Sequence, residues 1–132
     1  SFAVPEVTLG TICGAGGTQR LPRLIGETRA KEMIFTGRKI TAETAREWGL
    51  VNGVFTAGSL LEETLNLAEE IARNSPYAVT RAKRSVNGGR EMLLEEALEW
   101  ERSLFGECGE SRDRKEGMTA FLEKRPRIFT GE

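Results

Sequence analysis

The amino-acid sequence predicts a mostly α-helical chain that is one part of a larger α/β fold. From Ser59 onward, apolar residues recur at helical spacing almost throughout. Only residues 2–4 and 50–55 have the short apolar character of strands. About seven helices beside one or two strands is a lopsided content for a self-contained α/β domain. We therefore expect the helices to pack against structure outside this chain.

The opening residues give a second indication of a larger fold. Ser1 is followed directly by the apolar residues 2–4, without a Met or a leader. Pro5 then ends the predicted strand, because proline cannot donate a hydrogen bond to a sheet. A strand end without its sheet leads us to expect that the sequence begins within a longer protein.

Glycines and a capping residue delimit three short helices in the first part of the chain. Three glycines within residues 14–17 predict a tight loop that leads into the first helix. Thr41 is a good N-cap for the third, because its hydroxyl can accept a hydrogen bond from the first helical turn. The second and third helices are predicted over residues 27–35 and 42–48, and the three helices end at Gly26, Gly37 and Gly49.

Helices dominate the second part of the chain. Asn74-Ser75-Pro76 ends one helix and starts another, because proline is favoured in the first turn of a helix. The apolar positions predict helices over residues 59–72, from Pro76 to just before Gly88-Gly89, over 92–105 and over about 111–124.

Composition and charge exclude several classes of function. Of 132 residues, 39% are hydrophobic and 30% charged, which is ordinary for one globular domain and unlike a disordered chain. Nineteen Lys and Arg face 20 Asp and Glu, so the net charge of −1 gives no general attraction to nucleic acid or anionic membranes. No apolar run reaches the roughly 18 residues of a membrane helix.

Histidine is absent, and this restricts the chemistry further. Histidine-based nucleophile systems and histidine zinc sites are excluded, so proton transfer must fall to Glu, Asp, Lys, Tyr, Cys or water. Cys13 and Cys108 have no CxxC partner. We expect two reduced thiols and no metal site.

The glycine loop and Glu6 form the candidate site. The loop lacks the Gly-Lys-Ser/Thr of a Walker loop and the last glycine of GxGxxG, but its backbone N–H groups could still cradle an anion; the alternative is a simple tight connection. Glu6 follows the predicted strand end, eight residues before Gly14. Its carboxylate and a loop N–H could together hold and deprotonate one water, although a lone glutamate there could also be a solvated surface residue.

Six segments, taken in order, closely resemble the enoyl-CoA hydratase/isomerase (crotonase) family. They are Phe2-Ala3-Val4-Pro5-Glu6-Val7-Thr8-Leu9-Gly10, Gly14-Ala15-Gly16-Gly17-Thr18-Gln19-Arg20-Leu21, Thr36-Gly37-Arg38, Ala45-Arg46-Glu47-Trp48-Gly49-Leu50-Val51-Asn52, Asn74-Ser75-Pro76 and Glu116-Gly117-Met118-Thr119-Ala120-Phe121-Leu122-Glu123-Lys124-Arg125. The resemblance runs the whole chain and corresponds to roughly the C-terminal half of the family's domain.

The resemblance implies a fold and a division of the chain. It implies a mostly α part of an α/β spiral fold of the ClpP/crotonase type. Residues 1–58 would be the end of the β-β-α core, with the catalytic glutamate and the Gly-rich loop. Residues 59–132 would be the C-terminal helical region through which subunits trimerise.

The resemblance also implies roles for four residues. Glu6 matches the family's second catalytic glutamate, which in hydratases helps hold and activate the water added to an enoyl-CoA. Gly14 matches the glycine whose N–H helps position that water. Phe121 and Lys124 match positions that reach the CoA nucleotide of a neighbouring subunit, where a lysine suits phosphate. Cys13 stands where the family commonly has proline, and we expect a buried small thiol there rather than a nucleophile.

From the same resemblance we expect an acyl-CoA thioester substrate, no cofactor beyond the CoA of that substrate, and a homo-oligomer that is a trimer or a dimer of trimers. The expected compartment is the cytoplasm, or the mitochondrial matrix in a eukaryotic cell, without a membrane or nucleic-acid partner. The family's other glutamate and both oxyanion-hole N–H groups correspond to positions upstream of Ser1, so the chain alone would lack a complete site.

Three alternatives to a hydratase remain open at this point. An isomerase of the same family would use Glu6 to move a proton between carbons, and the upstream glutamate would distinguish the two. A noncatalytic helical module would form oligomers without turnover. Lys124-Arg125-Pro126-Arg127 also resembles the ends of certain mitochondrial hydratases reported to bind RNA, a reading that the net charge of −1 disfavours.

Overall fold

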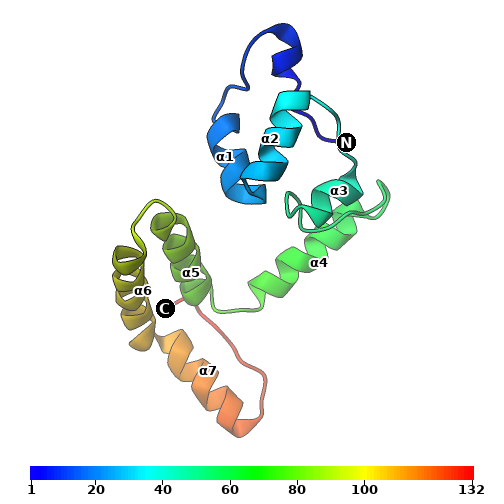
Figure 1. The fold of residues 1–132 in the computed structure, drawn as a ribbon. Helices are drawn as coiled ribbons and strands as arrows, with labels where there is room; N and C mark the ends of the chain where they lie inside the picture. Colours follow the sequence, from blue (N-terminus) through cyan, green and yellow to red (C-terminus); the bar gives the residue numbers. More distant parts are fainter. The chain divides into compact units, whose positions relative to one another are not determined.

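A computed structural model describes residues 1–132 and confirms the mostly helical prediction (Figure 1). The chain divides into two compact units, Ser1–Leu61 and Glu62–Glu132, which are described separately. It contains one 3-10 helix, η1 (Glu6–Leu9), and seven α-helices: α1 (Gly17–Ile25), α2 (Glu27–Thr36), α3 (Ala42–Glu47), α4 (Leu60–Ala72), α5 (Pro76–Gly89), α6 (Leu94–Gly109) and α7 (Arg112–Glu123).

The first unit is organised around a small apolar core beneath α1 and α2. Cys13, Ile25, Ala30 and Ile34 are buried there, because the two helices turn their apolar sides toward each other and toward the preceding loop. Partly buried apolar residues from before, within and after the two helices pack against this core: Val4, Val7, Leu21, Trp48 and Leu50. The core therefore links η1, the glycine loop and the segment after α3.

The predicted ends of the first two helices are confirmed, and the third helix ends one residue earlier than predicted. Gly26 and Gly37 follow α1 and α2, and Gly37 has the left-handed backbone, φ 62°, that commonly ends a helix. Thr41 caps α3 by accepting a hydrogen bond from Thr44 N–H at 3.1 Å. Trp48 is the C-cap of α3 rather than its last helical residue.

The predicted strands are the main difference between sequence and structure. Residues 50–55 form no strand: residues 50–52 are bends and residues 53–55 are irregular. The N–H groups of Leu50 and Val51 turn back to Ala45 O, at 2.8 and 3.4 Å, instead of meeting a partner strand. Of residues 2–4, only Phe2 pairs, in a single antiparallel bridge with Ile40. A strand needs a ladder, and this chain supplies a neighbour for one residue only.

In the second unit α5 and α6 lie side by side (Figure 1). Pro76 stands in the first turn of α5, as predicted, and Ser75 caps it by accepting from Ala78 N–H at 3.0 Å. The prediction that α5 stops before Gly88 is wrong, since the helix continues to Gly89. A Cβ at position 88 would lie 2.9 Å from Nε1 of Trp100 on α6, so a side chain there would displace the Trp100 ring, and the glycine allows the two helices to approach closely.

Two other helices differ from their predicted bounds by a few residues. The helix predicted over residues 92–105 begins at Leu94 and continues to Gly109, with Gly106 inside it. The last helix lies within residues 111–124 as predicted, with Ser111 as its N-cap and Lys124 as its C-cap.

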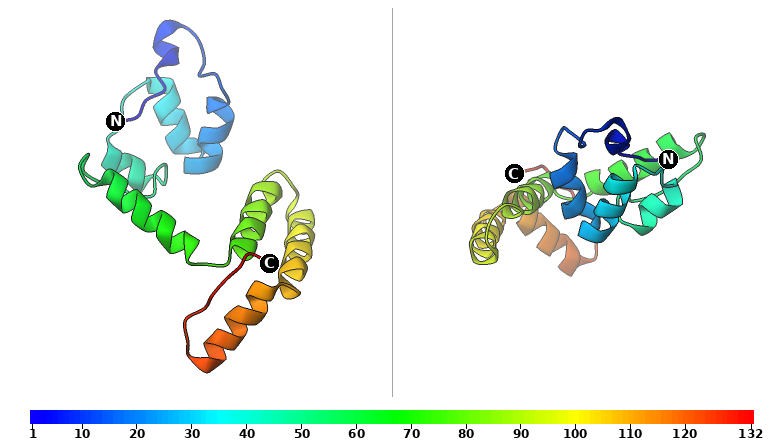
Figure 2. Two further views of the ribbon diagram at one scale, coloured as in Figure 1. Left: turned by 180° about the vertical axis from the view of Figure 1, so that it is seen from behind. Right: turned by 45° about the horizontal axis from the view of Figure 1, so that its top comes forward.

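After α7 the chain reverses, and residues 125–132 run back along the helix (Figures 1 and 2). Their path is visible in red from both sides. Hydrogen bonds fix it, since Asp113 N–H near the start of α7 donates to Glu132 O at 2.9 Å. We call residues 125–132 the returning segment.

Helix α4 carries leucines that the structure leaves uncovered. Leu61 is 70% exposed and Leu65 53% exposed. None of the helices is both long enough and apolar enough to cross a membrane.

Candidate functional site

Glu6 begins the 3-10 helix η1 rather than simply following a strand. Thr8 N–H donates to Pro5 O at 2.9 Å and Thr11 N–H to Glu6 O at 3.2 Å, which fixes the backbone on both sides of the glutamate. Val4 and Val7 pack against the core of the first unit. The half-buried Glu6 side chain is therefore held by neighbours that are anchored in the core.

One carboxylate oxygen of Glu6 is in an unusual environment. Its Oε2 atom is buried, and no group of the chain donates a hydrogen bond to it. Buried polar atoms in proteins almost always have a partner, so such an oxygen calls for an explanation in terms of a donor that this chain does not supply. The oxygen is also out of reach of bulk water, so it keeps an unused capacity to accept a hydrogen bond.

The glycine loop begins at Gly14, which is exposed and has open space around its α-carbon. Its carbonyl accepts from Gly17 N–H at 2.9 Å. Ala15 and Gly16 then both adopt left-handed backbone, with φ of 52° and 82°. These two positions turn the chain into α1, whose N-cap is Gly16.

Cys13 lies beneath this loop and is only 4% exposed. A Cβ at position 17 would lie 3.0 Å from Cys13 Sγ, so the glycine lets the start of α1 rest on the thiol. The predicted buried thiol is confirmed, and Cys13 and Cys108 are both free.

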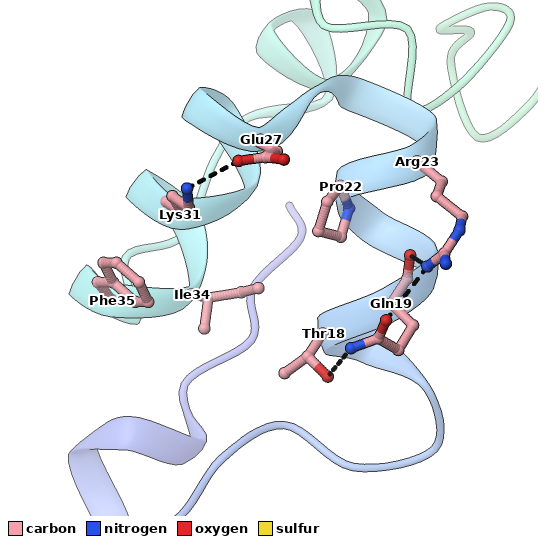
Figure 3. Close-up of a pocket in the computed structure, with 8 residues that line it drawn as sticks. All are labelled: Thr18, Gln19, Pro22, Arg23, Glu27, Lys31, Ile34 and Phe35. Carbon is pink, nitrogen blue, oxygen red and sulfur yellow. Dashed lines mark hydrogen bonds and ion pairs between the residues drawn. The ribbon is translucent and has the colours of Figure 1, made fainter.

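A cavity in the first unit lies between α1 and α2 (Figure 3). It has a volume of about 540 Å³. Polar side chains that line it already interact with each other. Lys31 Nζ forms an ion pair with Glu27 at 2.8 Å, and Arg23 Nη1 donates a hydrogen bond to Gln19 Oε1 at 3.2 Å. Neither Glu6 nor Gly14 lines this cavity, and no hydrogen bond joins those two residues.

Phe121 and Lys124 lie one turn apart at the end of α7, in the second unit. Phe121 is 81% exposed. Lys124 is exposed and has left-handed backbone, φ 52° and ψ 39°, which is uncommon for a residue other than glycine. Lys124 N–H donates to Phe121 O at 3.3 Å. An exposed aromatic residue and an exposed lysine are therefore joined through the backbone at the end of one helix.

A buried carboxylate that the sequence did not suggest lies near the start of α7. Asp113 is only 2% exposed and accepts hydrogen bonds from Ser75 Oγ at 2.6 Å and from Thr130 N–H at 2.8 Å. Burial raises the pKa of Asp113, but these bonds, with those from the N–H groups of Gly131 and Tyr77, outweigh it and leave the pKa below its ordinary value. Asp113 thus joins α5, α7 and the returning segment.

Glu116, one turn further along α7, makes a second connection. Its two oxygens accept from Arg125 Nη1 and Nη2 at 2.7 and 2.8 Å, and one also accepts from Ile128 N–H at 2.8 Å. The side-chain hydrogen bonds from Arg125, followed by the bond from Ile128, lower the pKa of Glu116 to about 2. Arg125 also donates to Glu123 at 2.6 Å.

No group of three or more Cys, Asp or Glu side chains is arranged to hold a metal ion.

The four site residues suggested by the sequence fall into two pairs, one in each unit. Residues 7–13 separate Glu6 from Gly14, and no hydrogen bond joins the two, whereas Phe121 and Lys124 are linked by a backbone bond at the end of α7.

Comparison with known proteins gives a consistent picture. The model of the family described as enoyl-CoA hydratase/isomerase matches residues 1–132. The mitochondrial enoyl-CoA hydratase of Pongo abelii is 48% identical over 128 residues, which are 97% of this chain and 44% of that protein. The 2,3-dehydroadipyl-CoA hydratase of Escherichia coli K12 is 45% identical over 130 residues, 98% of this chain and 51% of that protein.

Solved structures agree with the sequence comparison. The crystal structure of an enoyl-CoA hydratase from Bacillus anthracis superposes with a TM-score of 0.92 at 47% identity, over 97% of this chain and 50% of that one. The chain thus spans about half the length of the relatives that it matches.

Proposed function

The chain belongs to the enoyl-CoA hydratase/isomerase family, and we propose that it is the C-terminal part of an enoyl-CoA hydratase. Such an enzyme adds water across the 2,3 double bond of a 2-enoyl-CoA thioester, in the breakdown of fatty or branched acids. The hydratase names of the relatives in Pongo abelii and Escherichia coli support this reading over an isomerase. The observation that carries it is the buried, unpartnered oxygen of Glu6, at the position of the family's second catalytic glutamate.

Glu6 would act on the water. A water donating to the half-buried carboxylate of Glu6 would present a proton to it, while the buried Oε2 atom awaits a donor from outside this chain. As the water oxygen bonds to C3 of the substrate, Glu6 takes one proton of the water, and C2 takes one proton from a protonated carboxyl group of the same site. Return of the proton from Glu6 to that group closes the cycle, so the net change is the addition of one water. The exposed Gly14 N–H would help to position the same water.

The remaining catalytic groups belong to the upstream part of the family's domain. They are a second glutamate and two oxyanion-hole N–H groups, which stabilise negative charge on the thioester oxygen as the water adds. Removing a single oxyanion donor from an enzyme costs about 3–4 kcal/mol of barrier. We therefore propose that residues 1–132 alone hydrate substrate poorly or not at all.

Phe121 and Lys124 would contact the nucleotide part of CoA in a neighbouring subunit. A phosphate group is recognised well by the compact positive charge of a lysine, and a neighbouring aromatic ring gives a surface for a base. The proposed assembly is a trimer or a dimer of trimers, in which residues 59–132 make the subunit contacts and residues 1–58 complete the catalytic core. No cofactor is needed beyond the CoA of the substrate. The proposed compartment is the cytoplasm, or the mitochondrial matrix in a eukaryote.

The substitution Glu6→Gln in the longer enzyme, which joins this chain to its upstream half, tests the proposal. Glutamine keeps the shape of the side chain but cannot take a proton. We expect kcat for hydration of crotonyl-CoA to fall by at least about 100-fold, because a positioned base typically contributes ~10² to 10⁴ in rate. The KM should change little, since Glu6 does not bind the CoA.

A matched control is Glu47→Gln, which changes an exposed glutamate at the end of α3 in the same unit. That variant should retain the activity of the parent. Full turnover in the Glu6→Gln enzyme would remove Glu6 from the mechanism.

A further inference from the structure

We propose that Asp113 and Glu116 are positioning residues for the CoA contact made by Phe121 and Lys124, an inference that rests on the proposed function. The two carboxylates hold the returning segment against α7. In doing so they fix the backbone turn from which the Lys124 side chain projects.

The turn at Lys124 is a well-defined reversal of the chain. Arg125 N–H donates to Ala120 O at 3.0 Å and Lys124 N–H to Phe121 O at 3.3 Å. This pair of bonds is the Schellman arrangement, in which the left-handed position is usually glycine. A lysine remains in that conformation only where the surrounding structure imposes it. The reversal therefore needs support from beyond the helix end.

Glu116 supplies the nearer support. Its carboxylate accepts two parallel hydrogen bonds, of 2.7 and 2.8 Å, from the guanidinium of Arg125, the residue that directly follows Lys124. One oxygen also accepts from Ile128 N–H at 2.8 Å. A bidentate pair fixes the orientation of the arginine as well as its distance, so the chain leaves Lys124 in one direction.

Asp113 supplies the support at the far end of the returning segment. It accepts from Thr130 N–H at 2.8 Å and from Gly131 N–H at 3.1 Å, and Ser75 Oγ holds it in turn at 2.6 Å. Asp113 and Glu116 are three residues apart, so they lie on the same side of α7. The segment is thus tied along most of its length to one helix face.

Loss of these ties should affect binding of CoA rather than the chemical step. Without them Lys124 can leave its left-handed conformation, and its side chain no longer starts from one fixed backbone position. Neither carboxylate need touch the substrate. The expected signature is therefore a higher KM with kcat little changed.

Hydrogen exchange of the longer enzyme, which joins this chain to its upstream half, tests the structural half of the proposal. In Asp113→Asn the amides of Thr130 and Gly131 should exchange at least about tenfold faster, and in Glu116→Gln so should that of Ile128. Glu99→Gln, an exposed glutamate of α6, is the matched control and should change none of them. If Asp113→Asn fails to fold, Glu116→Gln still provides the test. Unchanged protection of these amides in the variants would overturn the proposal.

A double-mutant cycle in the longer enzyme tests the link to Lys124. We expect Asp113→Asn and Lys124→Ala each to raise the KM for crotonyl-CoA, and the double variant to be no worse than Lys124→Ala alone, since both act through one contact. Multiplying effects would contradict the proposal. If Lys124→Ala raises the KM and Asp113→Asn does not, the positioning role of Asp113 is contradicted, whereas the contact between Lys124 and CoA is retained. If Lys124→Ala has no effect, the CoA contact itself fails.

Discussion

Glu6 and Lys124 each occupy a local environment that is unfavourable for a residue of its type. Glu6 buries an oxygen that receives no hydrogen bond, and Lys124 has the left-handed backbone that suits glycine. Neither feature helps the chain to fold. Local costs of this kind concentrate where a side chain is needed for function, which is the role proposed for both residues.

A comparison of two substitutions at position 124 separates the ammonium from the backbone. Both Lys124→Ala and Lys124→Gly remove the charge, so both should raise the KM for crotonyl-CoA by a similar factor in the longer enzyme. Only glycine also relieves the left-handed strain, so Lys124→Gly should be more stable than Lys124→Ala by about 1 kcal/mol. Urea unfolding and steady-state kinetics give the two readouts.

Equal stability of the two variants would show that the backbone at position 124 is not strained. A KM that stays at the parental value in both would remove the lysine from CoA binding.

At the scale of the element, the returning segment depends on two carboxylates that must be ionised to accept all their hydrogen bonds. The pKa of Glu116 is lowered to about 2 from an ordinary value of 4.5, and the pKa of Asp113 is also below its ordinary value. A lowered pKa in the folded state means that the contribution to stability is complete above the ordinary pKa. It is lost as the pH falls toward the folded-state value.

The attachment of the returning segment should therefore survive at pH 5 and fail between about pH 4.5 and 2. NMR of the Ile128, Thr130 and Gly131 amides during an acid titration measures this directly. Glu116→Gln should abolish the transition seen at Ile128 and leave one at Thr130. Release of the segment at or above pH 5 would contradict the assignment of these carboxylates.

Most helices could be predicted from the sequence because their ends depend on nearby residues. Thr41, Ser75 and Pro76 act within one turn, so local spacing identifies them. The strand predicted at residues 50–55 failed for the opposite reason, since a strand depends on a neighbour that local pattern cannot supply. The end of α5 was predicted too early because Gly88 resembles a helix terminator in the sequence. In the structure Gly88 lies inside the helix and makes room for Trp100, twelve residues later in the chain.

In the candidate site, too, the residues can be suggested from the sequence, whereas the contacts between distant residues cannot. Glu6, Gly14, Phe121 and Lys124 could be suggested from family resemblance, and their roles remain predictions. The burial of Glu6 Oε2 could not be foreseen, because it results from packing. The bond between Asp113 and Ser75 joins residues 38 apart in sequence, which no helical periodicity relates.

At the scale of the whole chain, the apolar core is small. Eight apolar residues are buried in a chain of 132: Cys13, Ile25, Ala30, Met33, Ile34, Ala45, Leu104 and Ala120. Large apolar side chains on α4 and α7 stay exposed, among them Leu65 at 53% and Leu122 at 76%. This agrees with the proposal that further structure and neighbouring subunits cover these helices.

Association of the 132-residue chain should therefore depend on apolar residues of α4. We expect sedimentation velocity to show oligomers, and Leu65→Glu to weaken association by at least about tenfold, because a buried charge without a partner is costly. Asn66→Glu, at the neighbouring exposed position, is the control and should have a smaller effect. A chain that is monomeric at all concentrations, or equal effects of the two substitutions, would contradict a role of α4 in the interface.

We propose above all that this chain carries one part of a divided hydratase site. The most direct test of this claim is the hydration of crotonyl-CoA, followed by loss of the conjugated double bond, with the purified 132-residue chain and with the longer enzyme that includes the upstream half. We predict little or no turnover by the chain alone and full turnover by the longer enzyme. Turnover by the chain alone near that of the longer enzyme would contradict the claim, because the required groups would then lie within residues 1–132.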